Sequence, residues 1–140
     1  MKYKMVDEHI YVISLAPGEE IIDKINTFLE QEKIDNAYFF GIGALKKAEL
    51  AHFRVDTRNY SSKVFEEPLE LANLTGNAFL HEGKPLVHAH VTLANDRFET
   101  IAGHLVSGVI SAAGEILVRK LNSKIGKKHS PVIGLKLLNM

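Results

Sequence analysis

Hydrophobic and polar side chains alternate along most of this chain, which is the pattern of β-strands with one buried face. Clear alternation or strand-rich composition predicts strands at residues 9–15, 36–45, 49–55, 69–80 and 86–93. Weaker patterns predict further strands at residues 60–65, 111–121 and 131–138. Only residues 19–32 follow a helical period, because their apolar residues recur at spacings of three and four. The pattern therefore predicts many strands and one good helix.

These elements predict an α+β fold with an antiparallel sheet of about seven strands and one main helix. The length suits a single domain, residues 1–140. The apolar, glycine-containing strands at 36–45 and 105–118 offer more apolar surface than one helix can cover, so we expect an oligomer. Gly41 and Gly43 share one strand face, where the helix or a neighbouring subunit is expected to approach closely.

Three histidines carry the candidate chemistry of the sequence. His88 and His90 alternate with apolar residues in the strand at 86–93, so their side chains lie on the same face. His104 comes directly after Gly103, fourteen residues after His90, and its direction depends on the turn between the two strands. A two-residue loop would pair His88 with Gly103 and turn His104 to the other face. A three-residue loop, or a bulge at Gly103, would set His104 beside His88.

Three imidazoles on one face predict a metal site with His88, His90 and His104 as ligands and Zn²⁺ as the ion. Three protein ligands with an open position are typical of catalytic zinc, whereas structural zinc sites usually have four ligands that include cysteine. The chain contains no cysteine. Glu70 and Glu115 lie in apolar strands and are candidates for a catalytic acid or base. For all five residues the alternative is a structural role, and whether the protein is an enzyme stays open.

Composition restricts the partners that this chain is expected to bind. Its 17 basic and 17 acidic residues give a formal net charge of zero, which argues against strong non-specific binding to nucleic acid. The basic segment at 122–129 is interpreted as a solvated loop. No apolar run is long enough to span a membrane and the N-terminus does not look like a signal peptide, so the cytoplasm is the expected compartment.

Several short motifs occur along the chain in an order that is specific to one family. They are Gly41-Ile42-Gly43-Ala44, Leu69-Glu70-Leu71 leading to Leu74-Thr75-Gly76, Gly83-Lys84-Pro85-Leu86-Val87-His88-Ala89-His90-Val91, Ala102-Gly103-His104-Leu105 and Gly134-Leu135-Lys136-Leu137-Leu138. With them the chain resembles the plants and prokaryotes conserved (PPC) domain over nearly its whole length. In plants this domain belongs to AT-hook nuclear-localized proteins. In prokaryotes it is a free-standing protein, often named a predicted DNA-binding protein.

The resemblance implies a homotrimer with an antiparallel α+β fold that is similar to the fold of acetolactate decarboxylase. In that enzyme a His-X-His strand and one later histidine hold zinc, and His88, His90 and His104 match those ligands. A small-molecule ligand is one expectation, and a DNA or protein partner is the alternative. The chain lacks the Arg-Gly-Arg-Pro core with which an AT-hook enters the minor groove. Ala102 also departs from the glycine that many prokaryotic relatives have there.

Overall fold

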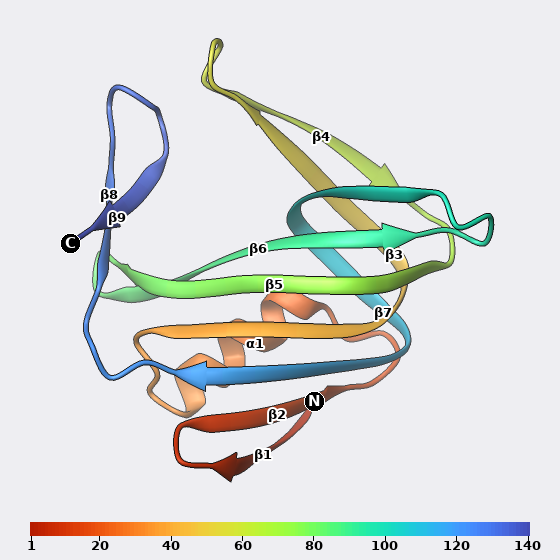
Figure 1. The fold of residues 1–140 in the computed structure, drawn as a ribbon, viewed down its shortest axis with the longest axis horizontal. Helices are drawn as coiled ribbons and strands as arrows, with labels where there is room; N and C mark the ends of the chain where they lie inside the picture. The colour runs from red at the N-terminus through yellow and green to blue at the C-terminus, as the bar shows by residue number, and fades with distance from the viewer.

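The computed structural model of the protein describes residues 1–140 and contains nine strands and one helix (Figure 1). All nine strands belong to one sheet, which is antiparallel except where β5 meets β8. The elements in chain order are β1 (Lys2–Asp7), β2 (Ile10–Leu15), α1 (Ile21–Gln31), β3 (Ala37–Arg54), β4 (Asn59–Phe65), β5 (Leu69–His81), β6 (Lys84–Ala94), β7 (Thr100–Lys120), β8 (Gly126–His129) and β9 (Lys136–Asn139).

The predicted sheet with one helix is confirmed, but the expected number of about seven strands is too low. The exposed edge strand β1 was not predicted, and β8 lies in the segment that was interpreted as a loop. The predicted strand at 131–138 is wrong in its first half. There the chain turns, with hydrogen bonds from the Gly134 N–H to the Ser130 carbonyl and from the Ser130 N–H to the Leu135 carbonyl. Only Lys136–Asn139 pairs, with β8.

Two long, bent strands, β3 and β7, hold the sheet together. β3 joins the predicted strands at 36–45 and 49–55, and its pairing with β7 shifts register at three places. Figure 1 shows β7 starting near β6, curving sharply, and then running along the first half of β3. Cβ atoms on Gly41 and Gly43 would each lie 2.5 Å from a carbonyl oxygen of β7. The close approach at these glycines is therefore made by β7, within the sheet, and not by the helix.

Helix α1 covers one face of the sheet and is fixed at its start by Glu20. The Glu20 carboxylate accepts hydrogen bonds from the N–H of Asp23 at 2.7 Å and of Gly108 in β7 at 2.8 Å. The first bond caps the helix, and the second joins it to the sheet. Four helix residues, Ile21, Ile25, Phe28 and Leu29, are buried in a core cluster of 24 residues. The helical period of the sequence therefore predicted both the helix and its buried face.

The structure contains no helix that could span a bilayer, since α1 has only eleven residues.

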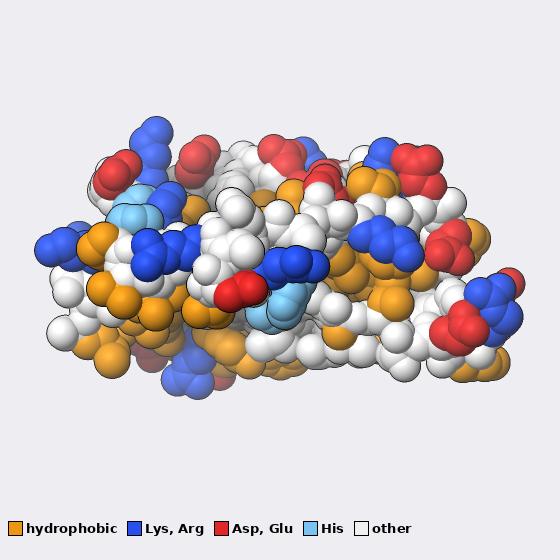
Figure 2. All heavy atoms as spheres, turned by 90° about the horizontal axis from the view of Figure 1, so that it is seen from above, with side chains coloured by type: hydrophobic (Ala, Val, Ile, Leu, Met, Phe, Trp, Pro, Cys, Tyr) orange, Lys and Arg blue, Asp and Glu red, His pale blue; other side chains and the backbone are white.

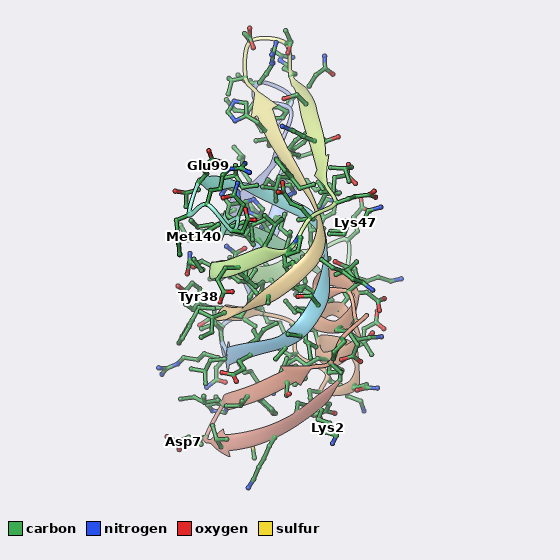
Figure 3. The ribbon with its side chains drawn as sticks, turned by 90° about the vertical axis from the view of Figure 1, so that its right-hand side faces the viewer. Lys2, Asp7, Tyr38, Lys47, Glu99 and Met140 are labelled. Atoms are coloured by element: carbon green, nitrogen blue, oxygen red, sulfur yellow. The ribbon has the colours of Figure 1, made fainter.

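The opposite face of the sheet, which we call the open face, carries exposed hydrophobic side chains. Tyr38, Phe40 and Ile42 of β3 are exposed at 44%, 48% and 56%. Figure 3 shows Tyr38 on the side of the sheet away from the helix, and Figure 2 shows hydrophobic side chains along one long side of the molecule while acidic ones gather mostly on the other. Phe40 pairs with Thr75 of β5, which pairs with His90. The open face therefore continues from the apolar residues to the histidines.

Gly76 of β5 is the position where the sheet tolerates a side chain least. A Cβ there would lie 2.3 Å from the ring of the fully buried Phe39 and 2.6 Å from the His88 carbonyl oxygen. We expect Gly76→Ala to lower the free energy of unfolding by about 1–3 kcal/mol, measured by urea denaturation. Gly126→Ala is the control, because the nearest atom to its Cβ would be 3.6 Å away. Equal stability of the two variants would contradict this packing.

Candidate metal centre

Three histidine side chains meet on the open face at the point where β6 and β7 separate. His88 and His90 lie on β6, and His104 of β7 pairs with His90 at the last position of the ladder between these strands. The ring centroids are 5.0 Å apart for His88–His90, 5.0 Å for His88–His104 and 5.7 Å for His90–His104. One ring nitrogen from each residue lies within 4.8 Å of the other two. The three imidazoles thus surround one small volume.

The turn that brings His104 to this face is longer than either loop considered from the sequence. Residues 95–99 connect β6 to β7, so Ala94 pairs with Thr100. The Asn95 side chain holds this turn, because its oxygen accepts hydrogen bonds from the N–H groups of Arg97 and Glu99, each at 3.0 Å. His104 therefore lies on the same face as the other two histidines, as the metal hypothesis requires. Its cross-strand partner is His90, however, and not His88.

The three histidines line a pocket of about 490 Å³ that has an aromatic wall. Phe53 and Tyr60 supply this wall from the β3–β4 hairpin, which projects beyond the rest of the sheet in Figure 1. The Tyr60 ring lies 5.0 Å from the Phe53 ring and 5.7 Å from the His104 ring, measured between centroids. His52 also lines the pocket but is not one of the three residues whose ring nitrogens converge. The pocket therefore combines imidazole nitrogens with an apolar side.

Both candidate carboxylates lie outside this pocket. Glu70 is exposed on β5, pairs with Ala44 and Ala94, and lines a different hollow near the β6–β7 turn. Glu115 is exposed on β7, where it pairs with Ser14 and with a residue of β3. No aspartate or glutamate lines the histidine pocket. The structure thus brings the three histidines together without an acidic side chain.

The environment of the pocket favours the neutral form of His88 and His104. Burial lowers the pKa of His88 to about 4, and the positive charges of Lys127, His104 and His90 act in the same direction. Burial also lowers the pKa of His104. The Nδ1 atom of His104 is buried without a hydrogen-bond partner. Neutral imidazoles are the form that binds metal ions, and an unpartnered ring nitrogen is free to act as a ligand, so the residues present fit a metal ion.

These pKa shifts predict how the stability of the metal-free protein depends on pH. Below the ordinary pKa of 6.5, His88 and His104 take up protons in the unfolded chain before they do so in the folded protein. Their contribution to stability is therefore present above about pH 6.5 and is lost as the pH falls towards about 4. Urea unfolding at about pH 7.5 and about pH 4.5 measures this loss. His88→Gln should lose less stability over this interval than the wild type, and an equal loss would contradict the assignment.

Lys127 of β8 lies next to the site, and the sequence pattern did not indicate this. It lies in the segment interpreted as a solvated loop, yet its side chain is half-buried on the open face. Its Nζ lies 3.3 Å from Oδ1 of Asn77 and 5.8 Å from the centroid of the Phe79 ring. Asn77 is the cross-strand partner of His88. Fifty residues separate Lys127 from Asn77, so no local pattern could have revealed this contact.

Comparison with known proteins identifies relatives over nearly the whole chain. The family model for the Plants and Prokaryotes Conserved (PCC) domain matches residues 4–122. A solved structure of a proposed DNA-binding protein from Bacteroides thetaiotaomicron is 30% identical, with a TM-score of 0.95 over 99% of this chain and 96% of that one. A plant- and prokaryote-conserved (PPC) protein from Pyrococcus horikoshii is 34% identical, with a TM-score of 0.86 over 94% and 91%. No curated protein matches the chain.

Two further solved structures are similar to this chain. A metal-containing protein from Archaeoglobus fulgidus is 27% identical, with a TM-score of 0.87 over 99% of this chain and 97% of that one. Acetolactate decarboxylase from Bacillus subtilis is 9% identical, with a TM-score of 0.57 over 87% of this chain and 57% of the enzyme. The likeness to the decarboxylase therefore concerns the fold alone.

Proposed function

The chain belongs to the Plants and Prokaryotes Conserved (PCC) domain family, and we propose that it binds one Zn²⁺ ion through His88, His90 and His104. The observation that carries this proposal is the convergence of three ring nitrogens within 4.8 Å of one another. Nitrogens bound to one zinc ion lie about 3–4 Å apart, so small ring rotations suffice. A similar protein from Archaeoglobus fulgidus, matched over 97% of its length, is a metal-containing protein, which supports the presence of a metal ion.

The donor set favours zinc over the other common divalent ions. Calcium and magnesium prefer oxygen ligands, and no carboxylate lines this pocket. Imidazole nitrogens suit zinc, and three of them leave one coordination position open. A zinc ion bound there would act as a Lewis acid and lower the pKa of a bound water to about 7. Because Glu70 and Glu115 lie elsewhere, the proposal is a metal site that accepts a small molecule, without a defined reaction.

We also propose that the protein is a homotrimer that assembles through the open face. Val12, Leu117 and Phe40 pair across β2, β7 and β3 and form an apolar row beside the exposed Tyr38 and Ile42. Contiguous exposed apolar surface of this kind marks interaction sites, and a formal net charge of zero permits self-association. Three copies are what the family resemblance implies. Residues 1–140 are proposed to form one domain of this assembly, and the cytoplasmic location stays a prediction.

DNA association is the second candidate function, supported by the description of the similar protein from Bacteroides thetaiotaomicron. The formal net charge of zero is unfavourable for contacts with many phosphates. A gel-shift titration with duplex DNA at two salt concentrations separates the candidates. Tight binding that weakens steeply with salt would favour the DNA role.

Zinc titration of the full, untagged chain tests the principal proposal. The protein is first treated with a chelator, and zinc is then added in competition with a coloured chelator of known affinity. We expect one tightly bound zinc ion per chain, confirmed by elemental analysis after dialysis. A metal content near zero after dialysis would remove the proposal.

A further inference from the structure

We propose that the ligand of the histidine pocket is a small carboxylate whose charge is received by the ammonium group of Lys127. This inference rests on the proposed zinc site, and it identifies the class of molecule that occupies the open position of the ion. It follows from the charge of the pocket, from the way in which Lys127 is held, and from the lining of the walls.

The pocket has an excess of positive charge that no residue of the chain balances. Three neutral histidines leave the double charge of a bound zinc ion uncompensated, and no acidic residue lines the pocket. Lys127 adds a further positive charge at the edge of the site. The ion pairs of the protein involve other basic groups, and the only polar partner of the Lys127 ammonium is the neutral amide of Asn77. A half-buried ammonium without a counter-charge favours binding of an anion.

Lys127 is held at this place by a buried amide. Asn36 is 1% exposed, and its side chain donates to the Ile125 carbonyl and accepts from the Ile125 N–H, each at 2.9 Å. The Leu80 N–H donates to the same carbonyl at 3.1 Å, and the His81 ring donates to the Lys127 carbonyl at 3.1 Å. These bonds fix the start of β8 against β5.

The alternation of β8 then separates its two lysines. Lys127 reaches Asn77, the cross-strand partner of His88, whereas the side chain of Lys128 is exposed. Side chains at directly paired strand positions lie about 5 Å apart, so Asn77 stands between the ammonium and His88. Lys127 is therefore next to the lining of the pocket, close enough for its charge to act on His88. Of two adjacent lysines, one thus lies next to the pocket, on Asn77, and the other is exposed to solvent.

The pocket suits a carboxylate better than a phosphate. One ammonium and one open metal position match the two oxygens of a carboxylate. No arginine and no helix N-terminus lines the pocket, although both are common in phosphate sites. Phe53, Tyr60 and Leu135 form walls that favour a short hydrocarbon or aromatic body. We therefore infer a monocarboxylate with a small apolar part.

Binding of butyrate and of its neutral analogue butyramide to the zinc-loaded full chain tests this inference by calorimetry. We expect butyrate to bind the wild type at least about tenfold more tightly than butyramide, because only the acid meets the ammonium. Lys127→Met should weaken butyrate binding by about tenfold or more, while zinc content stays at one ion per chain. Lys127→Arg should keep most of the affinity. Lys128→Met is the matched control and should not change it.

Each result decides for or against the inference. One zinc per chain with equal butyrate affinity in Lys127→Met and Lys128→Met would overturn it and leave the zinc site standing. Equal binding of butyrate and butyramide by the wild type would also overturn it, and this comparison needs no variant to fold. Tighter binding of inorganic phosphate than of butyrate would contradict the choice of a carboxylate. A wild-type chain without zinc would instead contradict the proposed function itself.

Discussion

His104→Ala is expected to lower the zinc affinity of the protein by at least about 100-fold. The substitution leaves two imidazoles on β6 and removes the only ligand that comes from β7. It should leave the fold intact, because the Nδ1 atom of His104 makes no hydrogen bond that the fold could lose. Zinc affinity is measured by chelator competition on the chelator-treated chain, and the fold is checked by thermal unfolding of the metal-free protein.

His52→Ala is the matched control for this variant. His52 lines the same pocket, but its ring nitrogens lie outside the converging group. We expect His52→Ala to bind zinc within about threefold of the wild type, since the His52 side chain is exposed and supplies no ligand atom. Undiminished zinc binding by His104→Ala, or an equal loss in both variants, would show that these three histidines are not the ligands.

Phe40→Asp is expected to convert the protein from a trimer to a monomer. Phe40 ends the apolar row on the open face and lies between the exposed Tyr38 and Ile42 along β3. A buried, unpaired carboxylate there is unfavourable by several kcal/mol. Analytical ultracentrifugation should find a mass of three chains of 15.6 kDa for the wild type and of one chain for the variant. The variant should remain folded, because the Phe40 side chain is 48% exposed in the single chain.

Val55→Asp controls for the added charge. Val55 follows the end of β3 at the tip of the β3–β4 hairpin, is 63% exposed, and lies away from the apolar row. This variant should stay trimeric. A monomeric wild type, or a Phe40→Asp protein that is still a trimer, would refute assembly through the open face.

Alternation along the sequence predicted the central strands and the helix well. The strands expected at 69–80 and 86–93 are observed as β5 and β6, because one face of each is buried in the core. The same reasoning divided β3 into two strands, since its register against β7 shifts where the strand bends. Bends and bulges depend on the strand that packs alongside, so a local pattern does not contain them. All residues of the edge strands β1 and β9 are exposed, so these strands show little alternation of hydrophobic and polar residues.

The candidate site shows the same division between local and long-range information. Side chains two residues apart in a strand point to the same face, so the sequence directly predicted that His88 and His90 are neighbours. The position of His104 depended on the length of a turn that the Asn95 side chain organises. The position of Lys127 is set by hydrogen bonds between the buried Asn36 side chain and the backbone of Ile125. These two residues are 89 positions apart in the sequence. Contacts of this kind are set by the tertiary fold, and a single sequence does not reveal them.

Anomalous scattering at the zinc edge, from crystals grown with zinc, locates the ion and identifies its ligands. We expect one peak per chain, about 2.0–2.1 Å from one ring nitrogen of each of His88, His90 and His104, with all three ligands from the same chain. No peak at this position, or a zinc ion held by other residues, would contradict zinc binding by these three histidines.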